Sequence, residues 1–210
     1  MGKKENQLNP NDAVCTPACI YEPVLEALGI HQFDLDPCGH PDATVPVRRS
    51  IILTDYVVSP EPAVRTLRRP QYVYGNGHKL RWRGKDVWLN PPYSQLQYGV
   101  ATKKNPEGGK YPWLYKLAHE ARRGVAFLPS RTSSGWWHEN VLRCKQADIL
   151  VQLKGRVQHI GHEYGSPFHQ VLVAYNIFDP YAIVDVSLGA WREAFRPHDA
   201  FVSDLREMRR

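Results

Sequence analysis

The chain has 210 residues, 42% hydrophobic and 11% aromatic, which is enough for one full domain with a sizeable core. No apolar run approaches the length of a membrane span, and the opening MGKKENQLNPND lacks the apolar stretch of a signal peptide, so we expect a soluble cytoplasmic protein with no membrane partner. The net charge of +6 is compatible with nucleic acid as a partner but does not identify one.

The four cysteines suggest either thiols, disulfides or a metal site. Without a signal peptide, reduced thiols are the expected state. Zinc is an alternative, because Cys15 and Cys19 are four residues apart and Cys38 is followed by His40. The spacing contains no paired CxxC, so we predict that no metal is bound.

Residues 1–13 are polar and predict a flexible tail, and residues 14–210 predict a single domain. Thr16 is a candidate helix cap, and Pro17 suits a first helical turn. Gly29 is expected to end this helix. Its apolar residues recur at helical spacing, at Ile20, Val24, Leu25 and Leu28.

Short strands are predicted next. Residues 33–36 are expected to form a short buried strand that stops at a Pro37–Gly39 loop, and residues 51–54 a second strand that ends at Asp55. Residues 56–80 are rich in proline and arginine and predict an irregular excursion. Residues 86–90 predict a buried strand.

The second half continues the alternation of helices and strands. Helices are predicted at 113–122 and 134–144, strands at 125–128, 149–153 and 171–175, and a helical, basic tail at 189–210. This order predicts an α/β fold with a mixed, mostly parallel sheet and helices on both faces. Antiparallel strands are plausible after residue 148. At least one of Trp136 and Trp137 is expected in the core.

Polar residues follow four of the predicted strands: Asp36, Asp55, Asn90 and Ser130-Arg131. The carboxyl ends of parallel strands meet at one edge of a sheet, where ligands of open α/β folds bind. We therefore expect these residues to contribute to one site.

Asn90-Pro91-Pro92-Tyr93 is the most specific segment. The Asn90 side-chain oxygen and a carbonyl of the rigid Pro pair can accept both hydrogens of an exocyclic amine. The Tyr93 ring can stack on a flat base. The tetrapeptide therefore suits an amine held in front of a methyl donor.

An ordered set of segments extends this reading beyond the tetrapeptide. The set comprises Thr16-Pro17, FDLDPCGHPDA at 33–43, VWLNPPYS at 87–94, FLPSRTSSGWW at 127–137, ADILVQLKGRV at 147–157 and VLVAY at 171–175. With these segments the chain resembles the phage-type DNA N6-adenine methyltransferases, within the class I S-adenosylmethionine-dependent enzymes and their Rossmann-like fold. The resemblance covers most of residues 15–176.

The resemblance implies S-adenosylmethionine as the methyl donor, DNA as the partner and a role in protecting phage DNA inside a bacterial host. Thr16 and Pro17 would border the donor pocket, and Asp36, Pro37 and Cys38 would lie under the methionine part of the donor. Asp55 is expected to bind the donor ribose, as acidic residues after a second strand do in related nucleotide folds. The target adenine would be bound by Asn90, Pro91, Pro92 and Tyr93.

Basic residues are candidates for contact with DNA phosphates. A dense run holds Lys79, Arg81, Arg83 and Lys85, and a later loop holds Lys103 and Lys104. A solvated loop explains the first run equally well. Arg131 follows a predicted strand and is expected to hold either a phosphate or the donor carboxylate.

We therefore predict an adenine-specific DNA methyltransferase that flips its target base. N4-cytosine methylation uses the same amine chemistry and is the nearest alternative, and RNA or a free base is a second. Residues 74–80 lack the Asp-Asp-Gly-Leu stretch common in the family, so a non-catalytic DNA-binding protein on a decayed scaffold is a third. The recognition sequence and oligomeric state do not follow from the sequence.

Overall fold

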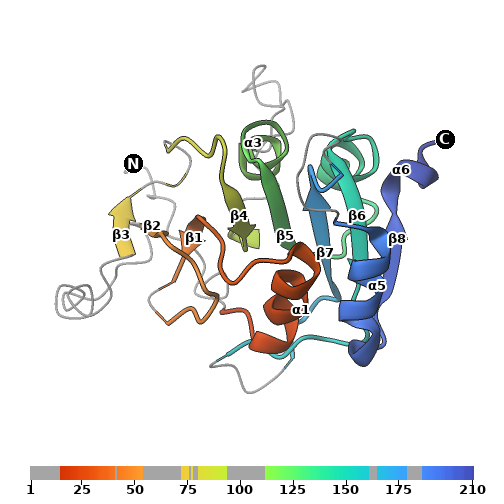
Figure 1. Ribbon diagram of the computed structural model, residues 1–210, viewed down its shortest axis with the longest axis horizontal. Coiled ribbons are helices and arrows are strands. Elements are labelled where there is room, and N and C mark those ends of the chain that lie inside the picture. Colours follow the sequence, from red (N-terminus) through yellow and green to blue (C-terminus); the bar gives the residue numbers. More distant parts are fainter. Residues whose placement is uncertain are drawn as a thin grey trace, which may run out of the picture.

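A mixed β-sheet forms the centre of the computed structural model (Figure 1). The structure describes residues 15–40, 42–53, 72–75, 77, 80–93, 112–160, 165–178 and 186–210. The strands are β1 (Asp36–Gly39), β2 (Ser50–Leu53), β3 (Tyr72–Gly75), β4 (Asp86–Leu89), β5 (Arg123–Pro129), β6 (Ala147–Gln152), β7 (Gln170–Tyr175) and β8 (Phe201–Asp204). The helical elements are α1 (Ala18–Leu28), α3 (Pro112–Glu120), α4 (Gly135–Trp137), η5 (His138–Leu142), α5 (Leu188–Phe195), η6 (Arg196–His198) and α6 (Leu205–Met208).

The strands form two sheets, β1-β2-β3 and β4-β5-β7-β6-β8, which meet at one bridge. Leu35, just before β1, pairs in parallel with Val87 of β4, and the Trp88 N–H donates to the Leu35 carbonyl at 3.0 Å. The spatial order across the molecule is therefore β3-β2-β1-β4-β5-β7-β6-β8. The pairings give β1 to β6 a common direction and reverse β7 and β8. The predicted mixed, mostly parallel α/β sheet is confirmed.

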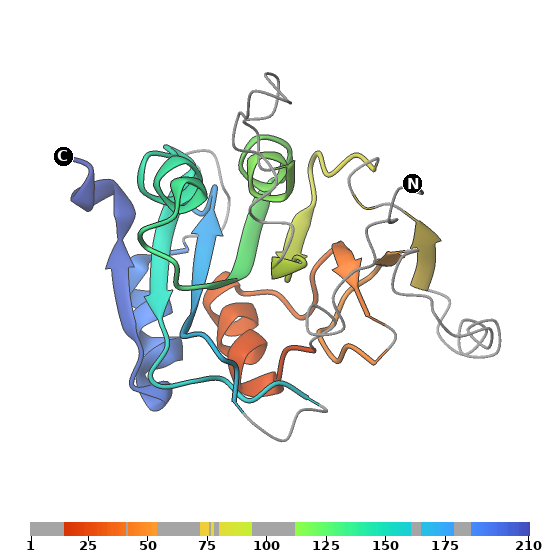
Figure 2. The same ribbon diagram turned by 180° about the vertical axis from the view of Figure 1, so that it is seen from behind.

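Helices cover both faces of this sheet, as the two opposite views show (Figures 1 and 2). Side chains alternate across each strand, so neighbouring residues enter different cores. Trp88 and Phe127 pack in one core with residues of α1 and α5. Leu89 and Leu128 pack in the other core with residues of α3, α4 and η5. Burying both faces of the sheet explains the nearly continuous apolar runs of its central strands.

Helix α1 ends as the sequence predicts but begins differently. Gly29 adopts a left-handed conformation with φ 63°, and its N–H bonds to the last turn of the helix. At the start, Pro17 is the N-cap and no side chain caps the helix. The prediction that Thr16 caps α1 is wrong, because its hydroxyl contacts Asn90 instead.

Three strand predictions need correction. The first strand begins at Asp36 and includes Pro37–Gly39, which the sequence predicted as a loop; β1 and β2 pair across a register shift that accommodates Pro37. Part of the predicted excursion is β3, held by β2 through regular parallel pairing. The predicted helical tail contains β8, because the free edge of β6 supplies a pairing partner.

The structure also shows the state of the tryptophans and cysteines that the sequence singled out. Trp136 and Trp137 are both buried. The four cysteines are free. Within the described part of the chain, no helix has the length and apolar character needed to cross a membrane.

Candidate functional site

The candidate site lies where β1 and β4 end side by side. The parallel bridge between Leu35 and Val87 aligns the two segments, so their carboxyl ends share one edge of the sheet. Asp36-Pro37-Cys38 belongs to β1, and Asn90–Tyr93 directly follows β4. The structure thus brings together the predicted donor-side and base-side segments.

Asn90 is oriented by the segment that precedes α1. Its Nδ2 donates to Thr16 Oγ1 at 3.4 Å, and Thr16 is 2% exposed. Because a side-chain amide is planar, a bond at Nδ2 leaves Oδ1 on the other side of the group. Pro91 and Pro92 are buried, which fixes the path of the chain after Asn90.

Tyr93 is held by residues that sequence reasoning missed. Its hydroxyl oxygen accepts a hydrogen bond from Gln170 Nε2 at 2.8 Å. Gln170 is the first residue of β7, and β7 runs antiparallel to β5, so it begins at the edge where β4 and β5 end. Gln170 Nε2 also lies 2.8 Å from Nε2 of His159, a residue of the segment after β6. In the sequence, a polar glutamine at the start of an apolar strand was the signal that could have indicated Gln170.

Asp36 is a buried carboxyl group with few partners. It is 4% exposed, and its Oδ1 accepts the Cys38 N–H at 3.0 Å. Burial raises the pKa of Asp36 to about 7, and the Cys38 hydrogen bond only partly opposes this. No lysine, arginine or histidine within the described part of the chain forms an ion pair with it. Such a group can change protonation when a ligand arrives.

Two glycines allow close packing around β1. A Cβ atom at Gly39 would lie 1.7 Å from Ser50 Oγ, and one at Gly77 would lie 2.0 Å from the Pro37 carbonyl oxygen. Glycine therefore lets the Ser50 side chain lie against the backbone of β1, and lets the backbone at Gly77 approach that of Pro37. The segment after β3 thereby packs directly on Pro37 of β1.

Cys15 is a buried thiol at the same edge. Its Sγ lies 3.4 Å from His40 Nδ1. Burial, followed by the charges of Asp42 and Asp36, raises the pKa of Cys15 to about 11. The thiolate is thus disfavoured at neutral pH, as is that of Cys38, whose pKa is raised by burial and by Asp36. Among the residues the structure describes, no three His, Cys, Asp or Glu side chains are grouped to hold a metal ion.

The predicted phosphate contacts are not all at this edge. Arg131 follows β5, and its guanidinium lies 4.5 Å from the centre of the Phe168 ring. Arg81, Arg83 and Lys85 precede β4 and therefore lie towards the opposite edge from Asn90. The aromatic residue in that run, Trp82, is buried and donates to the Gly77 carbonyl. Four other predicted site residues lie outside the described residues: Asp55, Lys79, Lys103 and Lys104.

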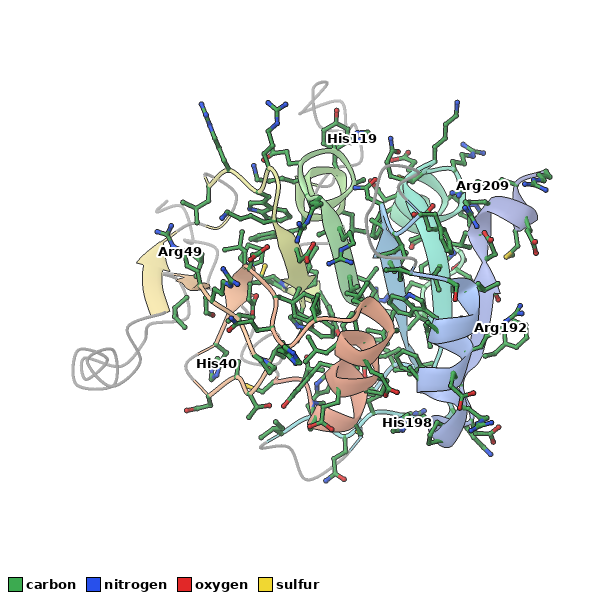
Figure 3. All side chains as sticks on the ribbon, in the orientation of Figure 1. His40, Arg49, His119, Arg192, His198 and Arg209 are labelled. Carbon is green, nitrogen blue, oxygen red and sulfur yellow. The ribbon has the colours of Figure 1, made fainter. Side chains whose placement is uncertain are left out.

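Two surface hollows lie elsewhere in the molecule. One, of about 870 Å³, is lined by residues of α5, β8 and α6, including Arg192. Another, of about 540 Å³, includes His119 of α3. Figure 3 shows these two side chains well apart from His40, which follows β1. Neither hollow contains a residue of the candidate site.

Comparison with known proteins adds little to these observations. No protein-family model matches the chain, and no curated protein is significantly similar in sequence. Among the solved structures that resemble it is one with a TM-score of 0.49 and 13% identity, covering 82% of this chain and 92% of that chain. It is a protein from Pyrococcus horikoshii assigned provisionally as an RNA methyltransferase. At this level of similarity the likeness assigns neither a family nor a substrate to this chain.

Proposed function

We propose that the protein is an S-adenosylmethionine-dependent methyltransferase that acts on the N6 amino group of adenine in DNA. The observation that carries the proposal is the position of Asn90-Pro91-Pro92-Tyr93 beside Asp36-Pro37-Cys38, at adjacent strand ends. The order β3-β2-β1-β4-β5 matches the first five strands of a Rossmann sheet, and such sheets bind ligands between β1 and β4, where the order reverses. The strand order therefore supports a nucleotide-like donor at this edge.

The residues on the β1 side suit such a donor. When bound, S-adenosylmethionine supplies a methyl group on a positively charged sulfur. The buried Asp36 carboxyl group can accept hydrogen bonds from donor hydroxyl or ammonium groups, and a nearby positive charge would favour its ionised form. Thr16 and Pro17 would border the donor, because Thr16 contacts Asn90 from the α1 side.

The residues on the β4 side suit an aromatic amine. The adenine N6 lone pair is delocalised into the ring and is a weak nucleophile. If Asn90 Oδ1 and the Pro91 carbonyl accept both N6 hydrogens, the nitrogen becomes more tetrahedral and its lone pair becomes available. The N6–carbon bond would form as the carbon–sulfur bond of the donor breaks, with S-adenosylhomocysteine leaving and one N6 proton passing to solvent. Aligning the amine with the methyl group contributes to the rate, within the roughly 7–11 kcal/mol attainable for well-oriented reactants.

The target base must leave the duplex to reach this site. Base flipping costs a few kcal/mol, and stacking on Tyr93 would return about 1–3 kcal/mol. Arg131 is a basic residue at the same edge, and we propose that it contacts a phosphate near the flipped nucleotide. Arg81, Arg83 and Lys85 remain predictions for phosphate contact, away from the base.

The function is tested by measuring modified bases. The wild-type protein is expressed in a bacterial strain without adenine methylation, and its DNA is digested to nucleosides for mass spectrometry. N6-methyladenine is expected with the wild type, and its loss with Asn90→Ala. Asn140→Ala is a matched control, because Asn140 Nδ2 bonds the Trp136 carbonyl within a helical segment remote from this edge.

Other outcomes separate the alternatives. N4-methylcytosine in place of N6-methyladenine would identify cytosine as the target, and methylation of purified RNA alone would identify RNA. Full activity of a folded Asn90→Ala protein would exclude the mechanism. If calorimetry detects no binding of S-adenosylmethionine to the wild type, a non-catalytic scaffold becomes the better explanation.

A further inference from the structure

A closed circuit of contacts passes through Asn90–Tyr93 of the candidate site. Thr16 accepts from Asn90, which leads through the two prolines to Tyr93. Tyr93 accepts from Gln170 at 2.8 Å, and Gln170 lies 2.8 Å from His159. His159 Nδ1 then lies 3.3 Å from the carbonyl oxygen of Cys15, the neighbour of Thr16. Three distant parts of the sequence, residues 15–16, 90–93 and 159–170, are joined in this circuit.

The hydrogen-bond directions within the circuit are determined by its chemistry. The Cys15 carbonyl can only accept, so His159 Nδ1 must carry the proton. In the neutral ring His159 Nε2 is then an acceptor, and its partner must be a donor. The Gln170 amide nitrogen satisfies this requirement and uses its second proton on the Tyr93 oxygen. The amide orientation and the histidine tautomer therefore support each other.

Burial makes this arrangement unusual for a strand. Gln170 is 1% exposed, and His159 is 5% exposed. The five residues of β7 after Gln170 are apolar or aromatic and buried. Gln170 Oε1 is also buried, without a hydrogen-bond partner among the described residues. Burying a side-chain amide lowers stability unless its polar atoms are hydrogen-bonded. An apolar residue would fit the pattern of β7 better.

We propose that Gln170 is a positioning residue for base binding, which fixes the Tyr93 ring and ties it through His159 to the Cys15-Thr16 segment. The inference rests on the proposed function, because it assigns Tyr93 the role of stacking on the target base. Gln170 acts through the tyrosine hydroxyl and does not contact the reacting atoms. The base-binding loop and the donor-side segment are thereby held as one unit.

A double-mutant cycle tests this role. Gln170→Leu removes both hydrogen bonds at similar volume, and Tyr93→Phe removes only the hydroxyl. Each variant is expected to lose about two- to tenfold in kcat/KM for DNA, the equivalent of one neutral hydrogen bond. The double variant should lose no more than the larger single loss, because both changes break the same contact. Losses that multiply would overturn the proposal.

Binding of the methyl donor distinguishes the positioning role from a general structural defect, which would weaken donor binding as well. The Kd for S-adenosylhomocysteine, measured by calorimetry, should change less than about twofold in Gln170→Leu. The substitution removes no hydrogen bond made by Thr16 or by Asp36–Cys38, the residues proposed to border the methyl donor. Gln152→Leu, the same substitution at the exposed end of β6, should leave both quantities unchanged. A large loss of donor affinity in Gln170→Leu would overturn the proposal.

Nuclear magnetic resonance tests the contacts without any activity. With ¹⁵N-labelled histidine, His159 should show a protonated Nδ1 in the wild type. In Gln170→Leu, both the His159 Nε2 signal and the Tyr93 ring signals should shift. An unchanged Tyr93 signal would overturn the positioning role even if DNA is methylated. If the shifts occur but no substrate is methylated, the circuit holds and the proposed function fails.

Discussion

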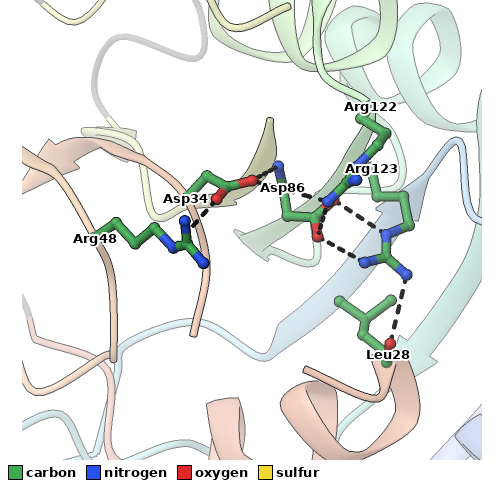
Figure 4. Close-up of polar contacts among 6 residues, drawn as sticks. All are labelled: Leu28, Asp34, Arg48, Asp86, Arg122 and Arg123. Atoms are coloured by element: carbon green, nitrogen blue, oxygen red, sulfur yellow. Dashed lines mark hydrogen bonds and ion pairs between the residues drawn. The ribbon is translucent and has the colours of Figure 1, made fainter. Parts of the chain in front are cut away.

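Two buried aspartates, each the first residue of its strand, have opposite hydrogen-bonding environments. Asp36 of β1 and Asp86 of β4 are 4% and 3% exposed. Asp86 receives two hydrogen bonds from Arg122 and two from Arg123, with N–O distances of 2.6–3.1 Å (Figure 4). Among the residues that the structure describes, Asp36 receives one, from the Cys38 N–H.

The pKa values follow this difference. Burial alone would raise the pKa of Asp86, but the hydrogen bonds from Arg123 and Arg122 outweigh it and hold the pKa below its usual range. At Asp36 burial prevails and the pKa is about 7. A carboxylate whose oxygens already accept several hydrogen bonds stabilises the fold, whereas one with unused acceptor positions can still bind a ligand. The contrast therefore separates an aspartate that stabilises the fold from one that the proposed function assigns to the methyl donor.

The largest effect on stability is expected at Asp86. Asp86→Ala would leave the Arg123 guanidinium, whose side chain is only 12% exposed, without its counter-ion. Removing one partner of a buried ion pair costs about 3–5 kcal/mol of unfolding free energy. Urea denaturation measures this loss, and folded protein should still bind S-adenosylmethionine.

A matched substitution controls for the loss of an aspartate. Asp199 forms an ion pair with Lys154, but both side chains are largely exposed. Asp199→Asn should leave the unfolding free energy nearly unchanged, because only an exposed ion pair is lost and asparagine tolerates the left-handed conformation of this position, with φ 50°. Equal losses in the two variants would contradict the view that burial gives the Asp86 contacts their importance.

Asp36→Asn should raise the unfolding free energy at neutral and alkaline pH, whereas Asp86→Ala lowers it. The pKa of Asp36 is raised on folding from its ordinary value of 3.8 to about 7, so between these values the folded protein holds a proton that the unfolded chain has released. Stability of the wild type therefore falls as pH rises from about 4 to 7 and then levels off. Asparagine removes this penalty, on the order of a few kcal/mol.

The measurement is urea denaturation of both proteins at several pH values. Asp36→Asn should be the more stable protein at about pH 8, and its advantage should shrink towards pH 4. Donor binding should weaken in the same variant, because a carboxylate acceptor is lost. A stability difference that is independent of pH would contradict the assignment of a protonated, buried Asp36.

The smallest effect is expected at the exposed end of the network around Asp86, in which Asp34 Oδ2 accepts the Asp86 N–H at 2.9 Å (Figure 4). Arg48 Nε lies 3.6 Å from Asp34 Oδ1, and the Arg48 side chain is 69% exposed. Arg48→Ala should lower the unfolding free energy by less than about 1 kcal/mol, with a smaller difference at high salt. Denaturation at two ionic strengths checks this. A loss comparable to that of Asp86→Ala would show that the network acts as a whole.

Local patterns predicted the elements that lie in the two cores. The helical spacing of Ile20, Val24 and Leu28 and the glycine at 29 located α1, and the apolar run before Asn90 located β4. These signals are reliable because each depends on neighbouring residues. β3 and β8 were missed because their short sequences become strands only through pairing with β2 and β6.

The candidate site likewise has a part that the sequence predicted and a part that only the structure revealed. The sequence by itself determined Asn90–Tyr93 and Asp36–Cys38 as chemically suitable segments at predicted strand ends. Only the tertiary structure decided that these ends are neighbours, that Thr16 bonds Asn90 instead of capping α1, and that Gln170 and His159 join Tyr93. The reason is physical: strand-end chemistry depends on residues adjacent in the chain, whereas the circuit depends on strand order and direction, which distant backbone pairing sets.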